Sequence, residues 1–460
     1  MVDTPAPASE PPKHPVDDKL PPGKLFTSGL QHVAAMYAGV VAPPLVVGKA
    51  VGLSATDMTF LVGASLFTAG LATLLQTIGF WKVGARLPFV NGVSFAGVAP
   101  MIAIADSTGR HDALPVIFGS VIVAGLVGCL VAPYFCRLIR FFPPVVTGSV
   151  ITLIGISLLP VAVGWIAGSD PSAPGYDALS NIVLAAITLV VVLALRRLLS
   201  GFLQQISILI GLVVGTLIAI PLGKTDFSPI GKAGLVGFPT PFHFGAPQFQ
   251  IPAILSMCIV MVVCLTESTA DILALGKVVE RPADEATLAA GLRADTLGSA
   301  ISPLFNGFFN SAFAQNIGLV AITKVRSRFV VAAGGVLLVL AGLCPVLASL
   351  ISLVPGPVLG GAGLVLFGTV ASSGVKTLAE ADLSDGNNLL IVGIAIGIGM
   401  IPIVSPGFYA HVDPHLQIVL NSGISTGCLV AVVLNLIFHH LGRRGTTEPD
   451  VPVQRERVPI

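Results

Sequence analysis

The sequence predicts an all-α polytopic membrane protein with 14 transmembrane segments. Of its 460 residues, 54% are hydrophobic and only 10% are charged, and the mean hydropathy is +0.92. Soluble globular proteins carry about 25% charged residues, so this chain lacks the side chains that would cover a water-facing surface. Apolar runs of about 20 residues favour helices over β-barrel strands, which give short alternating segments. This composition argues against a soluble enzyme, a nucleic-acid binder and a disordered scaffold.

Fourteen apolar runs follow one another along the chain. They lie near residues 28–47, 58–80, 87–105, 113–133, 142–166, 179–195, 202–222, 251–279, 286–302, 308–323, 329–352, 354–372, 388–405 and 416–438. Basic residues concentrate on the cytoplasmic side of membrane proteins. If both termini are cytoplasmic, only four of the 24 Lys and Arg residues lie outside: Lys49, Arg110, Lys224 and Lys232. We therefore expect a multi-pass protein of the cytoplasmic (inner) membrane with both termini in the cytoplasm.

Two polar tails frame the apolar runs. Residues 1–25 contain seven prolines and no apolar run, so we expect a cytoplasmic tail and no cleavable signal peptide. Residues 441–460 form a second cytoplasmic tail. The six cysteines form no CxxC pair and are interpreted as small buried hydrophobic residues. We expect no metal site and no cofactor.

Internal similarity predicts two repeats. One set of residues recurs at a shift of 213 and a second at a shift of 215. The sets are Pro144, Val145, Gly148 and Gly155 with Pro357, Val358, Gly361 and Gly368, and Pro88, Asn91 and Gly92 with Pro303, Asn306 and Gly307. Each match relates runs seven positions apart. Because seven is odd, the second half is inverted in the membrane, and the sequence predicts two inverted seven-span repeats.

The third and tenth runs are predicted to be interrupted. Residues 87–105 contain two prolines and several Gly, Asn and Ser residues, and residues 296–323 are similarly polar. Non-helical backbone at membrane depth is tolerated only where it is buried in protein or lines a cavity. A matched pair of broken segments in inverted halves indicates a binding site near the membrane midplane.

Glu267 lies at the centre of the run 252–279. A charged group at this depth is costly and is a candidate functional residue. Asp271 follows one helical turn later on the same face; a solvated or capping role remains equally open for it.

Four further polar residues lie inside apolar runs. Asp295 is either functional or paired with Arg293 at the membrane surface, and His32 is either functional or a satisfied structural histidine. Gln315 and Asn316 lie at the break of the tenth run, where they either cap a half-helix or line a cavity. No Walker A sequence and no nucleophile motif is present, so we expect neither ATP-driven transport nor an enzyme.

These residues carry a family resemblance. The stretch Gln315-Asn316-Ile317-Gly318, continued to Thr323-Lys324, resembles the nucleobase–ascorbate transporter signature Q-N-x-G-x-x-x-x-T followed by Arg, Lys or Gly. Gln31-His32 matches the Gln-His pair of the family, and Thr266-Glu267-Ser268 matches its acidic segment. The similarity extends over residues 26–440.

The resemblance implies an architecture and a mode of action. It implies a core domain of residues 26–140 (spans 1–4) and 250–352 (spans 8–11). It also implies a gate domain of residues 141–223 (spans 5–7) and 353–440 (spans 12–14). A homodimer and elevator-like motion of the core against the gate follow from the same resemblance.

The resemblance also bears on the substrate. Gln315, where uracil permeases have Glu, is similar to the bacterial branch that carries xanthine and urate. Thr296, after Asp295, departs from the Gly usual in that branch, and Lys324 does not distinguish xanthine from urate. A uracil or other nucleobase permease, and an anion transporter of the same inverted-repeat fold, remain the alternatives.

The resemblance implies specific roles. It places five residues in the substrate-binding site, with Asn316 supporting the contacts of the others: Glu267, Gln315, Asn316, Ser94 and Phe95. In this arrangement Glu267 accepts a ring N–H, the Gln315 amide pairs with the adjacent edge, and Phe95 packs on the purine face. Proton coupling is expected to involve Asp295, His32 and Glu267, and sodium coupling is left open.

Overall fold

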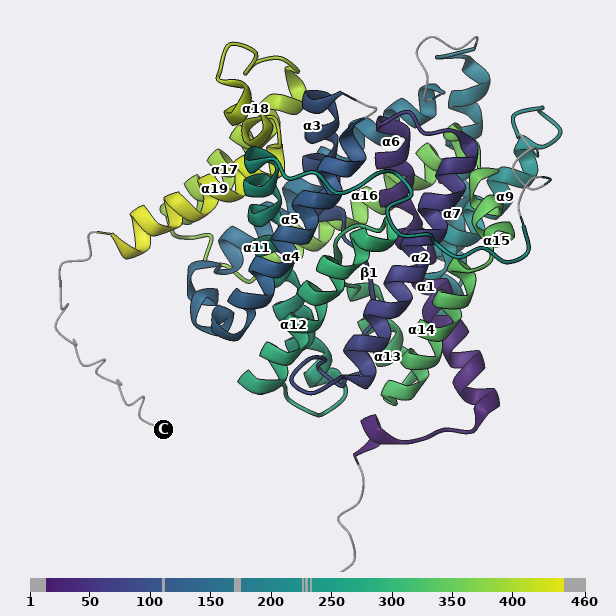
Figure 1. The fold of residues 1–460 in the computed structure, drawn as a ribbon, viewed down its shortest axis with the longest axis horizontal. Coiled ribbons are helices and arrows are strands. Elements are labelled where there is room, and N and C mark those ends of the chain that lie inside the picture. The colour runs from purple at the N-terminus through teal and green to yellow at the C-terminus, as the bar shows by residue number, and fades with distance from the viewer. Residues whose placement is uncertain are drawn as a thin grey trace, which may run out of the picture.

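The computed structural model describes residues 14–109, 112–168, 175–225, 227, 231 and 234–441. Its regular structure is almost entirely helical (Figure 1). Within this part of the chain, nine stretches are long and apolar enough to cross a membrane. They are α1 (Pro22–Ala50), α2 (Ala55–Ile78), α4 (Ala113–Leu138), α5 with α6 (Pro144–Ser157 and Leu159–Ala167), α7 (Leu179–Leu198), α11 (Ile251–Val278), α16 (Gly356–Leu378), α17 (Gly386–Val404), and α19 (Gly423–Asn435) with the π-helix Leu436–His440. The predicted polytopic all-α class is confirmed.

The remaining predicted spans are bent or short. Helices α14 (Arg328–Gly342) and α15 (Pro345–Ser352) meet at an angle of 87°, because Pro345 lacks the N–H that would continue the first helix. Four helices of 10 to 17 residues occupy the other predicted positions. They are α3 (Val98–Thr108), α9 (Ser207–Ala219), α12 (Glu285–Ile301) and α13 (Ala314–Thr323). A span needs about 20 residues, so the count of 14 stays a prediction.

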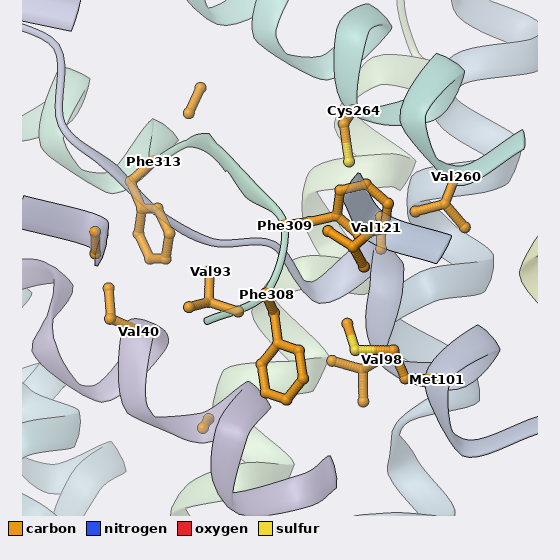
Figure 2. Close-up of a cluster of buried hydrophobic side chains, with 14 of the residues drawn as sticks. Val40, Val93, Val98, Met101, Val121, Val260, Cys264, Phe308, Phe309 and Phe313 are labelled. Carbon is orange, nitrogen blue, oxygen red and sulfur yellow. The ribbon is translucent and has the colours of Figure 1, made fainter. Parts of the chain in front are cut away.

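Two short strands interrupt the third and tenth segments as predicted. Strand β1 (Asn91–Val93) pairs antiparallel with β2 (Asn310–Ala312), with Gly92 opposite Ser311. A 3-10 helix, η2 (Phe95–Gly97), and then α3 follow β1, while α13 follows β2. Val93 in β1, and three phenylalanines that flank β2 in the chain, are at least 95% buried: Phe308, Phe309 and Phe313 (Figure 2). The broken backbone therefore lies inside protein, where its polar groups can be satisfied.

Each strand is held by a hydroxyl from the preceding helix of its own half. Thr73 Oγ1 in α2 donates to the carbonyl of Asn91 (3.0 Å) and accepts from its N–H (3.1 Å). Ser299 Oγ in α12 makes the same pair with Asn310, at 3.1 and 2.9 Å. The two halves therefore repeat one hydrogen-bond pattern.

This pattern corrects the sequence alignment of the broken segments. Asn310, 219 residues after Asn91, is the structural counterpart of Asn91, so the predicted shift of 215 is wrong by four residues. Asn306, which the sequence match paired with Asn91, instead adopts a left-handed conformation with φ 65°. Its Nδ2 donates to the Thr240 carbonyl (2.9 Å) in the loop before α11. The sequence match rested on a shared Pro-x-x-Asn-Gly pattern, which is typical of turns. It did not relate residues that occupy equivalent positions in the two repeats.

The helix packing shows the inverted repeat directly. Helices α1 and α2 of the first half both pack on α14 of the second half. Their counterparts α11 and α12 of the second half both pack on α4 of the first half. Exchanging each helix for its counterpart seven positions along converts one set of contacts into the other. Helices α5 and α16, which are counterparts, pack on each other at the centre. The predicted pair of inverted repeats is confirmed.

The most extensive helix contacts fall within two groups. We call α1–α4 with α11–α14 the crossed-strand group, because it contains β1 and β2. We call α5, α6, α7, α9, α16, α17 and α19 the flanking group. The predicted division of the chain into a core and a gate domain, and the motion of one against the other, stay predictions.

The N-terminal segment docks on two loops of the crossed-strand group. In the short helix η1 (Pro15–Asp17), Asp17 pairs with Arg281 (3.1 Å) and Arg328 (2.7 Å). Ser327 Oγ donates to the Asp18 carbonyl (2.6 Å). The predicted tail of residues 1–25 is therefore partly structured, with α1 already beginning at Pro22. Residues 1–13 of this tail and 442–460 of the C-terminal tail lie outside the described residues.

Candidate functional site

A cavity of about 480 Å³ lies between the crossed strands and the flanking group. Ser94 and Phe95 enter it from the end of β1, Gln315 from the start of α13, and Glu267 from the middle of α11. The structure thus brings together four of the five predicted substrate-binding residues. They are far apart in sequence and meet because β1 and β2 pair with each other beside α11.

The break after β1 sets the position of Ser94 and Phe95. The Ser94 N–H donates to the Phe309 carbonyl (2.9 Å), and its Oγ accepts from the Ala96 N–H (3.3 Å), which caps η2. Ser94 Oγ also lies 3.5 Å from Cys264 Sγ in α11. Phe95 follows directly and its ring forms part of the cavity wall. The capping bond of Ser94 therefore fixes the position of Phe95 next to α11, the helix that carries Glu267.

Glu267 contributes a carboxyl to the cavity. In the described part of the chain, none of the ion pairs involves this residue. Asp271, one turn along α11, has a buried Oδ2 atom with no hydrogen-bond partner among the described groups, which argues against a solvated role. A carboxylate without a basic partner is available to accept hydrogen bonds from a ligand.

Gln315 lies at the beginning of α13 with its side chain at the cavity. The helix has Phe313 at its N-cap and no side-chain capping bond, so Gln315 does not act as the predicted alternative, a helix cap. An amide presents a donor and an acceptor side by side, which suits the edge of a flat heterocycle.

Asn316 and His32 lie behind the cavity wall. Asn316 Nδ2 is 3.0 Å from His32 Nδ1 and donates to the His32 carbonyl at 3.2 Å. Both side chains are at most 2% exposed, and neither lines the cavity. The pair joins α1 to α13 and holds the helix that presents Gln315. The predicted direct contact of Asn316 with a ligand stays untested, and its position suits the supporting role.

Asp295 also lies outside the cavity lining. It is 3% exposed and accepts hydrogen bonds from Gln76 Nε2 (2.9 Å) and Asn91 Nδ2 (2.5 Å). Arg293 does not form the alternative salt bridge, since it donates to the Lys82 carbonyl (3.3 Å). Asp295 therefore joins α12 to β1, the strand that Ser94 follows directly in the chain.

Sequence reasoning missed two parts of this site. Gln76 in α2 was not singled out, although a glutamine inside an apolar run is a signal that a polar partner exists. The opposite wall of the cavity was also missed. Its residues come from α5, α16, the short helix α8 (Gly201–Gln205) and α9: Ile151, Ile154, Leu366, Thr369, Val370, Ser373, Gln205 and Leu209. Most are apolar residues that sequence alone cannot distinguish from lipid-facing ones.

Comparison with known proteins decides the family. A model described as a permease family matches residues 23–408. The chain belongs to the nucleobase–ascorbate transporter family. This permease is 42% identical to the uric acid permease PucJ of Bacillus subtilis over 94% of its own length and 96% of the relative. It is 40% identical to the xanthine permease of the same organism (95% and 99% covered) and 39% identical to the uric acid transporter UacT of Escherichia coli (99% and 96% covered).

Solved structures share the fold of this permease. The transmembrane domain of the cyanobacterial bicarbonate transporter BicA aligns with a TM-score of 0.55 at 17% identity, covering 90% of this chain and 97% of that one. The murine anion transporter Slc26a9, in an inward-facing state, aligns with a TM-score of 0.59 at 13% identity, covering 90% and 68%. The predicted family and inverted-repeat fold are confirmed: the chain is a multi-pass membrane transporter and not an enzyme.

Proposed function

We propose that this permease is a secondary active transporter that carries a purine nucleobase, xanthine or urate, across the cytoplasmic membrane by proton symport. The observation that carries the proposal is the meeting of Glu267, Gln315 and Phe95 at one cavity. A carboxylate, an amide and an aromatic ring match a flat molecule that has N–H donors and carbonyl acceptors on its edge. The names of the uric acid and xanthine permeases to which the chain is similar support the same substrate class.

Binding follows from hydrogen-bond complementarity. Glu267 accepts from a ring N–H while Gln315 donates to a carbonyl and accepts from the neighbouring N–H. Phe95 stacks against the ring, and the apolar wall of Ile151 and Ile154 excludes water on the other side. Water exclusion strengthens each of these hydrogen bonds, so the site favours a ligand that satisfies all of them.

Coupling is assigned to the buried carboxyl groups. Protonation of Glu267 or Asp295 would remove a charge that is expensive inside the membrane. His32 lies one hydrogen bond behind Gln315, through Asn316. The membrane potential contributes about 2.3 kcal/mol per charge per 100 mV, which concentrates a neutral substrate roughly fifty-fold per proton. Sodium is the alternative coupling ion.

Transport is proposed to follow an elevator-like motion. The crossed-strand group acts as the core and carries Glu267, Gln315 and Phe95, and the flanking group acts as the gate. A homodimer in the inner membrane, with both termini cytoplasmic, completes the proposal. The basic loops around Arg281 and Arg328 support this orientation, because basic residues favour the cytoplasmic side.

Purified protein in liposomes tests the function. Uptake of labelled xanthine is measured under a pH gradient, with and without a protonophore, and with sodium replaced by potassium. Unlabelled urate, hypoxanthine, uracil and bicarbonate serve as competitors. Competition by urate and loss of accumulation with the protonophore are expected. Competition by uracil alone would favour a pyrimidine permease, and competition by bicarbonate alone would favour an anion transporter.

A further inference from the structure

The cavity extends toward the side of the molecule that carries the N-terminal segment. Its lining includes Arg196 at the end of α7 and Ile322 at the end of α13. Ile322 is 54% exposed, and the loop that follows it leads to Arg328, which pairs with Asp17. This basic side is the cytoplasmic side in the proposed orientation.

The opposite end of the cavity is occupied by packed aromatic rings. The ring of Phe95 packs edge-on against Phe367 in α16, with centroids 6.0 Å apart and planes at 77°. Phe367 in turn lies 6.2 Å from Trp165 in α6. Lys49 Nζ, at the end of α1, lies 5.1 Å from the Trp165 ring centroid. Phe367 is fully buried and Trp165 is 5% exposed. We call these four residues the outer column.

Helix directions place the outer column beyond the cavity, away from the basic side. In α1 the cavity lining ends at Gly39, and Lys49 lies ten residues further, about 15 Å along the helix. In α16 the lining residues Val370 and Ser373 follow Phe367 toward the basic side. The column therefore continues from the ligand-contacting ring to the outer surface.

The outer column is built from both helix groups, with its two inner members in one group and its two end members in the other. Lys49 and Phe95 belong to the crossed-strand group, while Trp165 and Phe367 belong to the flanking group. A displacement of one group along the other would separate Lys49 from Trp165 and Phe95 from Phe367 in the same movement. A cation over an aromatic face gains most when it is shielded from water, so the contact favours the state in which the groups are aligned as here.

We propose that the outer column closes the cavity to the outside in this conformation, with Phe367 as a positioning residue for Phe95 and Lys49 on Trp165 as its outer latch. The substrate-facing end of the column rests on the proposed function, but the closure itself does not. Opening toward the outside requires the Lys49–Trp165 and Phe95–Phe367 contacts to break. Opening at the outer surface is therefore coupled to release of the Phe95 ring, which faces the substrate.

Thiol labelling from each side tests the closure without any substrate. Thr369→Cys places a thiol in the cavity wall, in a background whose six native cysteines are replaced and which still catalyses uptake. A membrane-impermeant maleimide is added to intact cells. Lys49→Gln, Trp165→Leu and Phe367→Leu are each expected to raise the outside labelling rate about three- to tenfold. Lys49→Arg, which keeps the cation over the ring, is expected to restore the slow rate.

Two comparisons separate closure from general loosening. Lys224→Gln removes a cation on the same side of the molecule. Lys224 follows α9 and its partner Asn181 lies in α7, so this contact stays within the flanking group and does not connect the two groups. The labelling rate should therefore not change. In inside-out vesicles the column variants should label no faster than the background, because they favour the outward-open state. Faster labelling from both sides, or an unchanged outside rate in Lys49→Gln, overturns the proposal. The labelling experiment uses no substrate, so either result leaves the proposed function to be tested separately by xanthine uptake.

Discussion

At the residue scale, Glu267 is the only carboxyl among the predicted site residues that lines the cavity described by the structure. Glu267→Gln keeps the volume and removes a charge-assisted acceptor. Such a bond contributes about 1.5–3 kcal/mol, so the affinity for xanthine should fall roughly ten- to a hundredfold. Binding is measured on purified protein, with the elution profile as the control for folding. Unchanged affinity would refute the contact.

Gln315 bears on specificity. Gln315→Glu replaces an amide donor with an acceptor and adds a second acid at the same cavity as Glu267. A site built on hydrogen bonds strongly rejects a ligand that leaves one of its groups unpaired. Xanthine and urate should therefore lose more affinity than analogues that offer an N–H at that edge.

Competition across a panel of purines and pyrimidines measures this change in specificity. Gln315→Asn, which keeps the amide and shortens it, is the matched control. An equal drop for every ligand would show that Gln315 is structural.

Asp295 differs from Glu267 because it lies behind the wall, bonded to Gln76 and Asn91. Asp295→Asn should therefore retain xanthine binding within a few-fold and lose accumulation against a gradient. Binding and pH-driven accumulation are measured on the same preparation. If binding collapses together with accumulation, the assignment of Asp295 to coupling is wrong.

At the element scale, the central crossing of α5 and α16 depends on small residues. A Cβ atom on Gly374 would lie 2.2 Å from the backbone N of Thr152, whereas one on Gly368, in the same helix, would meet nothing within 4 Å. Backbone cannot yield as a flexible side chain can. Gly374→Ala should cost about 1–3 kcal/mol as overpacking, and Gly368→Ala should be near neutral.

Melting temperatures of the two glycine variants in detergent measure this difference. Equal melting temperatures would mean that the crossing adapts to an added methyl group. The sequence repeat paired Gly155 with Gly368, yet only Gly155 of that pair is tightly packed, against Ala371. Residues that match between the two sequence repeats therefore do not always make equivalent contacts in the structure.

At the scale of the whole molecule, the N-terminal segment connects loops that are distant in sequence. Asp17 pairs with Arg281 before α12 and Arg328 at the start of α14. Its side chain is 36% exposed, and exposed ion pairs contribute about 0–1 kcal/mol each. Asp17→Asn should therefore lower the melting temperature only slightly but release the segment to added protease.

Asp18→Asn is the matched control for the segment, because Asp18 binds through its backbone carbonyl. Limited proteolysis followed by mass measurement of the N-terminal fragment distinguishes the two variants. Equal cleavage rates would show that the Asp17 ion pairs do not hold the segment in place.

The sequence determined the class, the inverted repeat, the two broken segments and four residues of the cavity. Each of these leaves a local trace: apolar runs for the spans, Pro and Gly for the breaks, and a polar side chain where the membrane makes it costly, as at Glu267 and Gln315. These signals can be read from the sequence alone. The free-energy cost of a polar group in lipid depends on its depth in the membrane, and its position within the apolar run gives that depth.

Only the tertiary structure decided which residues meet. The pairing of Asn91 with Ala312 set the true register of the repeat, and the Gln76 and Asn91 bonds placed Asp295 behind the cavity. The apolar wall of Ile151 and Ile154, and the contact of Lys49 with Trp165, have no signature in sequence. The reason is physical: apolar contacts are non-directional and many pairings are equally compatible with the composition, so the packing of the whole chain selects among them.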